Sequence, residues 1–216
     1  MTGAPAAPNA GRGMFIVFEG GEAVGKTTQI ATLIAHLGRT RPNLEVVRSR
    51  EPGGTPAAEA LRSVVLDSRY AGLAPRAEAL VFAAARADHV EQIVRPALQR
   101  GACVVLDRYI DSSVVYQGVA RGLGTDEVER LSMWATQSLV PDLVVLLDLD
   151  PRIGLSRVGQ PDRLESEGIA FHDAVRAGFL ARAQADPQRY AVIDATGSAV
   201  EVAAQVAAAV ENLLNG

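Results

Sequence analysis

The chain has 216 residues, of which 48% are hydrophobic and 21% charged, a composition typical of one soluble globular domain. Its formal net charge of -4 argues against a protein that coats nucleic acid, because neutralising phosphates takes a surplus of basic residues. A single cysteine, Cys103, excludes an intramolecular disulfide and any multi-cysteine metal site. No apolar run reaches the length of a membrane helix, so we do not expect a membrane partner. The acidic charge balance likewise leads us to expect no nucleic-acid partner.

Residues 1–13 are rich in Ala, Pro, Gly and Asn and contain no apolar core segment. This stretch therefore resembles neither a signal peptide nor a strand, and we expect a disordered extension. A cytoplasmic location is the corresponding expectation.

From residue 14 onward, short apolar runs alternate with longer amphipathic ones. The pattern predicts strands at 14–19, 44–50, 102–106, 143–147 and 190–193. It predicts helices at 27–37, 56–66, 75–99, 125–139, 171–185 and 199–214, the third bent at Pro96 because proline lacks the amide donor. Such alternation indicates one α/β domain over 14–216, with three layers and a central parallel sheet flanked by helices. The segment 156–168 lacks clear periodicity, and we expect it to be a short lid.

The first strand is followed directly by a phosphate-binding motif of the form GxxxxGK[ST], which opens the first helix. Its backbone amides and helix N-terminus suit a triphosphate, Lys26 would reach the β- and γ-phosphates, and the Thr27 hydroxyl would ligate Mg²⁺. The fold expected is therefore that of a P-loop NTPase, with ATP and Mg²⁺ as cofactors. The predicted ATP-binding residues are Gly20, Gly21, Glu22, Ala23, Val24, Gly25, Lys26, Thr27 and Thr28.

Lys26 is the only lysine among 21 basic residues. Arginine cannot replace a compact ammonium that must fit between phosphates, which supports a functional role for this position. The same count rules out the NKxD motif of a GTPase, and the length leaves little room for the sensor segments of a motor ATPase. A small-molecule kinase remains.

Two further strand ends carry charged residues. The third predicted strand leads into Asp107 and Arg108, at the edge where parallel sheets bind ligands. Asp107 could hold the water shell of Mg²⁺, or it could simply cap the turn and pair with Arg108. The second strand ends at Arg50, before the turn that starts with Glu51 and Pro52, where an anionic acceptor could dock.

The segments GGEAVGKTTQ, REPGGT, FAAAR and DRYIDSSVVYQG, in this order, resemble the thymidylate kinase family, which phosphorylates dTMP with ATP. The resemblance runs from about residue 14 to the end of the chain. It implies that Arg50 and Arg108 hold the dTMP phosphate, that Phe82 stacks on thymine, and that Arg86 hydrogen-bonds the base. It also implies a homodimer and assigns Glu51, Pro52, Ser113, Tyr116 and Gln117 to the dTMP site.

Glu22, with no arginine beside it in the loop, resembles the bacterial form of this family, whose catalytic arginines lie in the lid. Glu22 would then lie near the 3′-hydroxyl or the metal. The lid offers Arg157 and Arg163 as catalytic residues, fewer than the denser basic lid of bacterial relatives. Which of them acts stays open, and both could instead pair with Asp162 and Glu165.

The expected reaction is in-line phosphoryl transfer from ATP to the phosphate of dTMP, giving dTDP. Lys26, Arg108 and a lid arginine would offset charge on the transferred group. The alternatives are a P-loop kinase for another monophosphate or for a deoxynucleoside, and an ATP-binding regulatory module without turnover.

Overall fold

The computed structural model describes residues 12–215, so most of the predicted N-terminal extension, residues 1–11, lies outside the described residues. Residues 12 and 13, the last two of the predicted extension 1–13, contact the domain. Arg12 donates a hydrogen bond of 2.6 Å to the carboxylate of Asp142, and the amide of Gly13 donates one of 2.7 Å to the carbonyl of Leu98. Gly13 has no room for a side chain, because a Cβ would lie 1.9 Å from the Ala102 carbonyl oxygen.

Within the described range, five parallel strands form one sheet in the order β2-β3-β1-β4-β5. The strands are β1 (Phe15–Glu19), β2 (Val46–Arg50), β3 (Cys103–Asp107), β4 (Leu143–Asp148) and β5 (Tyr190–Asp194). All of β1 is buried, as are all but the last residues of β3 and β4, because helices cover both faces of the sheet. The predicted strands and the parallel sheet are confirmed.

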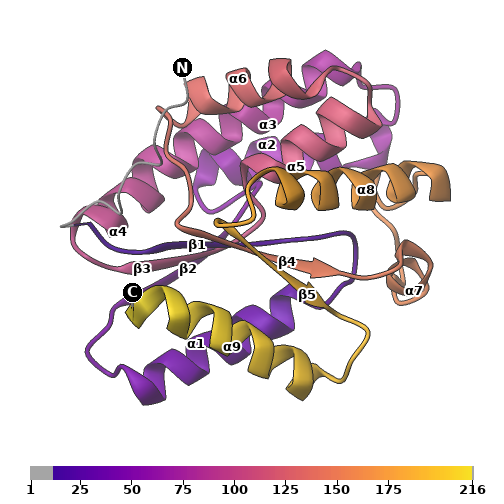
Figure 1. Ribbon diagram of the computed structural model, residues 1–216. Coiled ribbons are helices and arrows are strands. Elements are labelled where there is room, and N and C mark those ends of the chain that lie inside the picture. Colours follow the sequence, from indigo (N-terminus) through magenta and orange to yellow (C-terminus); the bar gives the residue numbers. More distant parts are fainter. Residues whose placement is uncertain (1–11, 216) are drawn as a thin grey trace.

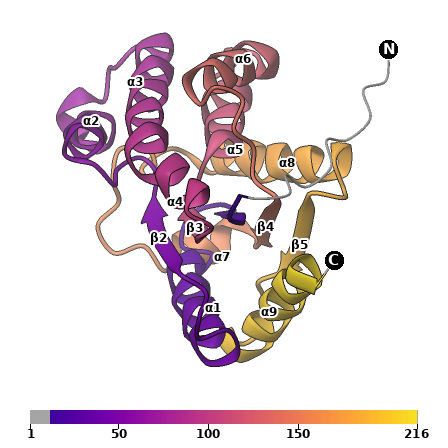
Figure 2. The same cartoon turned by 90° about the vertical axis from the view of Figure 1, so that its left-hand side faces the viewer.

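Helices cover the two faces unequally (Figures 1 and 2). One face packs against α1 (Lys26–Thr40) and α9 (Ala199–Asn215), around a core that includes Ile30, Leu33 and Val206. The other face is covered by α3 (Pro75–His89), α4 (Arg95–Gln99), α5 (Ile110–Ser113), α6 (Thr125–Ala135) and α8 (Ile169–Ala185). Beside α3 lies α2 (Pro56–Leu66), and α7 (Pro151–Leu155) follows β4. The predicted three-layer α/β architecture is confirmed.

The predicted helix 75–99 is continuous but not uniform. A π-helical turn over Val90–Val94 separates α3 from α4, directly before Pro96. Proline supplies no amide donor and crowds the carbonyl four residues earlier, so wider hydrogen bonding ahead of it lets the helix continue. The irregularity therefore lies one turn earlier than the predicted bend.

The helices differ from the prediction in two other places. The helix 125–139 ends early, as α6, because Gln137 (φ 50°) and Ser138 (φ 59°) adopt left-handed backbone. The segment after β3 is helical, α5 continuing into a π-helical stretch, Val114–Ala120, although no helix was predicted there. Its β-branched residues and glycine disguise a helical pattern. This segment carries three of the predicted substrate residues.

Candidate active site

The phosphate-binding loop joins β1 to α1 at the carboxyl edge of the sheet. Gly20 (φ 135°) and Gly25 (φ 97°) hold backbone angles that side chains disfavour, and a Cβ on Gly20 would lie 2.5 Å from a β4 carbonyl oxygen. Lys26 Nζ donates to the carbonyls of Gly20 at 3.2 Å and Gly21 at 2.7 Å. The loop lines a cavity of about 880 Å³, which lies where the sequence predicts the cradle for the donor phosphates.

Lys26 and Thr27 present the chemistry expected of this loop. Burial, together with the nearby Arg108, lowers the pKa of Lys26 to about 8. Thr27 Oγ1 lies 3.5 Å from Asp107 Oδ2, so a hydroxyl and a carboxylate face the same point beside the loop. Among residues 12–215, no group of three or more His, Cys, Asp or Glu side chains could hold a metal ion. A hydroxyl and a carboxylate are oxygen donors, the kind of ligand that Mg²⁺ takes together with several waters and the oxygens of bound phosphates.

Arg108 follows β3 with a left-handed backbone (φ 67°) that turns its side chain back over the phosphate loop. Its guanidinium pairs with Glu22 at 2.8 Å, donates to the Gly20 carbonyl at 3.0 Å, and lies 5.2 Å from the ring centre of Tyr116. Tyr116 in turn donates a hydrogen bond of 2.5 Å to Glu22. Burial opposes ionisation of Glu22, but Arg108 and Lys26 outweigh it and lower the pKa of this carboxyl to about 2.

A second acid, Glu19, holds the turn after β3 through hydrogen bonds. It is fully buried at the end of β1 and accepts hydrogen bonds from the amide of Tyr109 at 2.8 Å and from the amide and hydroxyl of Ser112 at 3.1 and 2.6 Å. Burial and the nearby Asp111 raise the pKa of Glu19. Glu19 was not predicted as a site residue, although its place directly before the phosphate loop is visible in the sequence.

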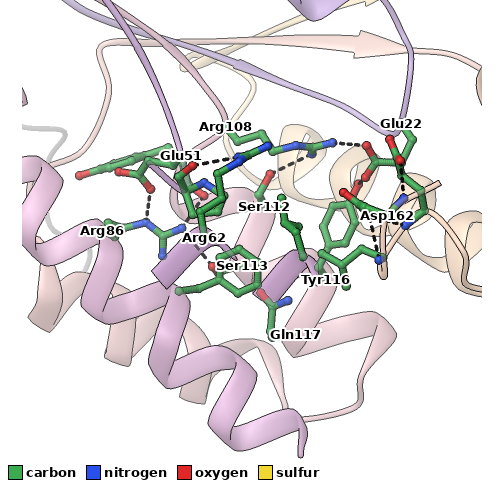
Figure 3. A pocket seen from close by; sticks show the side chains of 16 residues that line it. Glu22, Glu51, Arg62, Arg86, Arg108, Ser112, Ser113, Tyr116, Gln117 and Asp162 are labelled. Carbon is green, nitrogen blue, oxygen red and sulfur yellow. Dashed lines mark hydrogen bonds and ion pairs between the residues drawn. The ribbon is translucent and has the colours of Figure 1, made fainter. Parts of the chain in front are cut away.

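A second cavity, of about 660 Å³, lies between α3, the helical segment 110–120 and the 162–165 turn. Phe82, Arg86, Ser113, Tyr116 and Gln117 all line it, as do Glu51 and Pro52. The structure thus brings the predicted dTMP-site residues together, with the exception of Arg50. Figure 3 shows Arg86 beside Glu51 and Arg108 reaching Glu22 at opposite ends of this cavity.

Arg86 is held rigidly inside the protein. Its Nε donates to Glu51 at 2.7 Å, Nη1 to the Ser132 hydroxyl at 3.2 Å, and Nη2 to both the Tyr109 carbonyl and the Ser113 hydroxyl at 3.0 Å. Four of its five N–H groups are therefore used by the protein, which leaves one on Nη1 for a ligand acceptor.

Two further arginines line the phosphate-loop cavity. Arg50 lines only the phosphate-loop cavity, where it forms an exposed pair with Glu59 at 2.8 Å. Arg62, on α2, lines both cavities and donates to the Pro52 carbonyl at 2.9 Å. Arg62 was not predicted from the sequence, because a single arginine on an amphipathic helix carries no distinguishing signal.

The two lid arginines occupy different environments. Arg157 is exposed, and its Nη1 lies 3.4 Å from the carbonyl of Ala23 in the phosphate loop. Arg163 is 6% exposed; it pairs with Glu78 at 2.5 Å and donates to the Val65 carbonyl at 2.7 Å. It is not among the residues that line either cavity. The structure therefore brings Arg157, and not Arg163, to the phosphate loop, and neither pairs with Asp162 or Glu165 as the alternative held.

The two cavities adjoin, since four residues line both: Glu22, Glu51, Arg62 and Arg108. A triphosphate cradle that opens onto a second polar pocket, on a parallel sheet with this loop, defines a P-loop nucleotide kinase. A family profile described as thymidylate kinase matches residues 18–206. The chain belongs to the thymidylate kinase family, which phosphorylates dTMP to dTDP with ATP.

Individual proteins similar to this chain are also named thymidylate kinases. The chain is 51% identical over 201 residues to a thymidylate kinase of Leifsonia xyli subsp. xyli, covering 90% of this chain and 92% of that protein. It is 48% identical over 202 residues to one of Deinococcus radiodurans, covering 92% and 97%. A crystal structure of thymidylate kinase from Ehrlichia chaffeensis superposes with a TM-score of 0.78 at 30% identity, covering 92% of this chain and 98% of that one.

Proposed function

We propose that this chain transfers the γ-phosphoryl group of ATP directly to the phosphate of dTMP, with the donor in the phosphate-loop cavity and the acceptor in the adjoining one. The observation that carries the proposal is the shared wall formed by Glu22, Glu51, Arg62 and Arg108. Two nucleotides that end at this wall would meet phosphate to phosphate, which is the in-line arrangement that phosphoryl transfer needs. The acceptor is largely ionised near neutral pH, so no strong general base is required.

On the donor side, residues 20–28 would bind the phosphates of ATP, and Lys26 would exchange its two loop carbonyls for the β- and γ-phosphates. Thr27 and Asp107 would hold Mg²⁺, the hydroxyl directly and the carboxylate through its water shell. When bound, the metal ion supplies charge that offsets the phosphate oxygens.

On the acceptor side, Arg108 and Arg62 would hold the dTMP phosphate, and Arg50 would join them by leaving its exposed pair with Glu59. Phe82 would stack on thymine, and the remaining N–H of Arg86 would bind a base carbonyl. Tyr116, Ser113 and Gln117 would contact sugar and base, with Glu51 and Pro52 closing the pocket.

Glu22 would keep Arg108 extended over the loop and lie close to the sugar hydroxyl. Arg157 would supply the lid charge on the transferred phosphoryl group, because it alone of the two lid arginines lies beside the loop. We assign Arg163 to the framework of the lid rather than to the chemistry.

An ATP-coupled assay across the nucleoside monophosphates and thymidine tests the proposal, with Lys26→Ala as the inactive control. The expected result is turnover with dTMP and none with thymidine, since the shared wall places cations where a phosphate must sit. Turnover of thymidine would support a nucleoside kinase, and ATP binding without product would support a regulatory module.

We further propose a homodimer, supported by Trp134 on α6 and Leu80 on α3, which are 80% and 58% exposed on neighbouring helices. Light scattering coupled to size exclusion should give twice the chain mass, and Trp134→Glu should halve it.

Among the described residues no helix is long and apolar enough to cross a bilayer. A cytoplasmic location, where ATP and dTMP are available, is proposed and can be checked by cell fractionation.

A further inference from the structure

Glu78 is a fully buried carboxylate on α3 that lines neither cavity and has no part in the proposed reaction. It lies four residues before Phe82 and eight before Arg86, and therefore on the same helix face as both. Burying an acid this deeply is costly unless charged or polar groups satisfy it. Arg163 and Arg121 do so, at 2.5 and 3.4 Å.

The third partner of Glu78 is an acceptor-site residue. Gln117 Nε2 donates to Glu78 Oε1 at 2.8 Å. A carboxylate held by two guanidinium groups has no proton to donate, so the amide atom that faces it has to be the nitrogen. The other amide atom of Gln117, Oε1, accepts no hydrogen bond from the described residues, and Gln117 lines the acceptor cavity. Gln117 is therefore oriented with its acceptor free for a ligand.

We propose that Glu78 is a specificity-determining positioning residue, which fixes the Gln117 amide so that the acceptor cavity presents a hydrogen-bond acceptor next to the donor of Arg86. This inference rests on the proposed function and deepens it. Arg86 can only donate, since a guanidinium has no acceptor. Arg86 can donate to a base carbonyl and Gln117 can accept from the neighbouring ring N–H, so the pair matches thymine and uracil. Cytosine has an amino group and an unprotonated ring nitrogen at these positions and does not match.

The neighbouring contacts keep this orientation in place. Ser113 accepts from Arg86 at 3.0 Å and lies four residues before Gln117 in the same helical segment. That segment therefore helps to position both Arg86 and Gln117. Arg121 is held by Glu167 at 2.7 Å and by the face of Phe171 at 4.9 Å, and Arg163 by the Val65 carbonyl. Both guanidinium groups are thus anchored away from the cavity and keep the Glu78 carboxylate an acceptor.

The test uses Glu78→Gln in the full-length enzyme, with kcat/KM measured separately for dTMP, dUMP and dCMP. A glutamine at 78 can offer either amide atom, which lets Gln117 turn and present its N–H to cytosine. We expect the preference for dTMP over dCMP to fall about 10-fold to 100-fold, the effect of one reversed hydrogen bond in a buried site. The ratio of dTMP to dUMP should stay unchanged, because the two bases share the same edge.

Arg121→Gln is the matched control, because it removes another partner of Glu78 without touching Gln117. There both ratios should stay within about twofold of the wild type, whatever happens to stability. An equal loss of kcat/KM for all three nucleotides in Glu78→Gln would show that Glu78 is purely structural and would overturn the proposal. If Glu78→Gln does not fold because Arg163 loses its partner, Glu78→Gln with Arg163→Gln restores the charge balance and is measured against Arg163→Gln alone. Absence of dTMP turnover in the wild type would instead refute the proposed function.

Discussion

Replacing Arg163 by alanine should unfold the protein more readily rather than act mainly on the chemistry. The substitution removes a buried partner 2.5 Å from Glu78 and leaves that carboxylate with the looser Arg121 at 3.4 Å. It also removes the donor to the Val65 carbonyl, near the end of α2. Deleting one member of a buried ion pair costs about 3 to 5 kcal/mol. For a domain of this size, that corresponds to a fall in Tm of roughly 6 to 20 °C.

Arg157→Ala is the matched comparison from the same lid. Its guanidinium is exposed and makes one long contact, 3.4 Å, with the Ala23 carbonyl, so its loss should change the free energy of unfolding by less than about 0.5 kcal/mol. If it stabilises the transferred phosphoryl group, kcat should fall by about 10² to 10³ with little change in KM for dTMP.

Thermal unfolding followed by circular dichroism, together with steady-state kinetics on dTMP, separates the two residues. An Arg163→Ala variant that melts like the wild type while its kcat collapses would refute the framework role, because Arg163 would then be a mobile catalytic group. An unchanged kcat in Arg157→Ala would show that the lid charge comes from another residue.

The other predictions concern the phosphate loop and its acids. Lys26→Ala should lower kcat by about 10² to 10³, and near-normal turnover would count against the phosphate-loop assignment. Because the pKa of Lys26 is lowered to about 8, kcat/KM for ATP should decline above that pH as the ammonium loses its proton, and a flat profile to pH 10 would contradict this. The pKa of Glu22 is lowered from 4.5 to about 2, so its ionised form stabilises the fold above pH 4.5 and this stability is lost as the pH falls towards 2. Urea unfolding should show an acid loss of about 3 kcal/mol that Glu22→Gln lacks; equal acid slopes would speak against the pair with Arg108. Asp107→Asn should raise the Mg²⁺ concentration needed for half-maximal activity by about 10-fold to 100-fold, and an unshifted Mg²⁺ titration would argue against its place in the metal site.

The parts of the fold that were predicted correctly share one property, a repeating pattern over a continuous segment. The apolar runs of β1, β3 and β4 are buried on both faces, so their composition alone identifies them. The helix after β3 was missed because Val114, Val115 and Gly118 are poor helix formers that tertiary packing holds in a helix.

Residues of the site were predictable where they belong to a motif, and not where only the third dimension brings them together. Lys26 belongs to the phosphate-loop motif and Arg108 directly follows β3, so both could be placed from the sequence. Arg62 and Glu78 lie on helices, outside any motif, and acquire their roles only through the residues that pack against them. Arg163 shows the reverse case: its position in an irregular segment suggests a mobile lid, whereas its contacts with Glu78 and Val65 bury it.

The ion pairs explain how a site rich in arginine is kept ready for phosphate. Glu22 holds Arg108 and Glu51 holds Arg86, both in buried or partly buried pairs that also satisfy backbone carbonyls. Such pairs fix geometry, but their charge is already balanced before a nucleotide arrives.

Arg62 differs from these, since it forms no ion pair with any residue in the range 12–215. Burial and the neighbouring Arg50 lower its pKa, against the opposing effect of the nearby carboxylates of Glu59 and Asp162. Because it lines both cavities, its charge lies where, in the proposed arrangement, the donor and acceptor phosphates would meet. The exposed pair between Arg50 and Glu59 is weak and can exchange for phosphate. In the proposed arrangement, the acids thus set the positions of Arg86 and Arg108, while Arg62 would supply positive charge that attracts both phosphates.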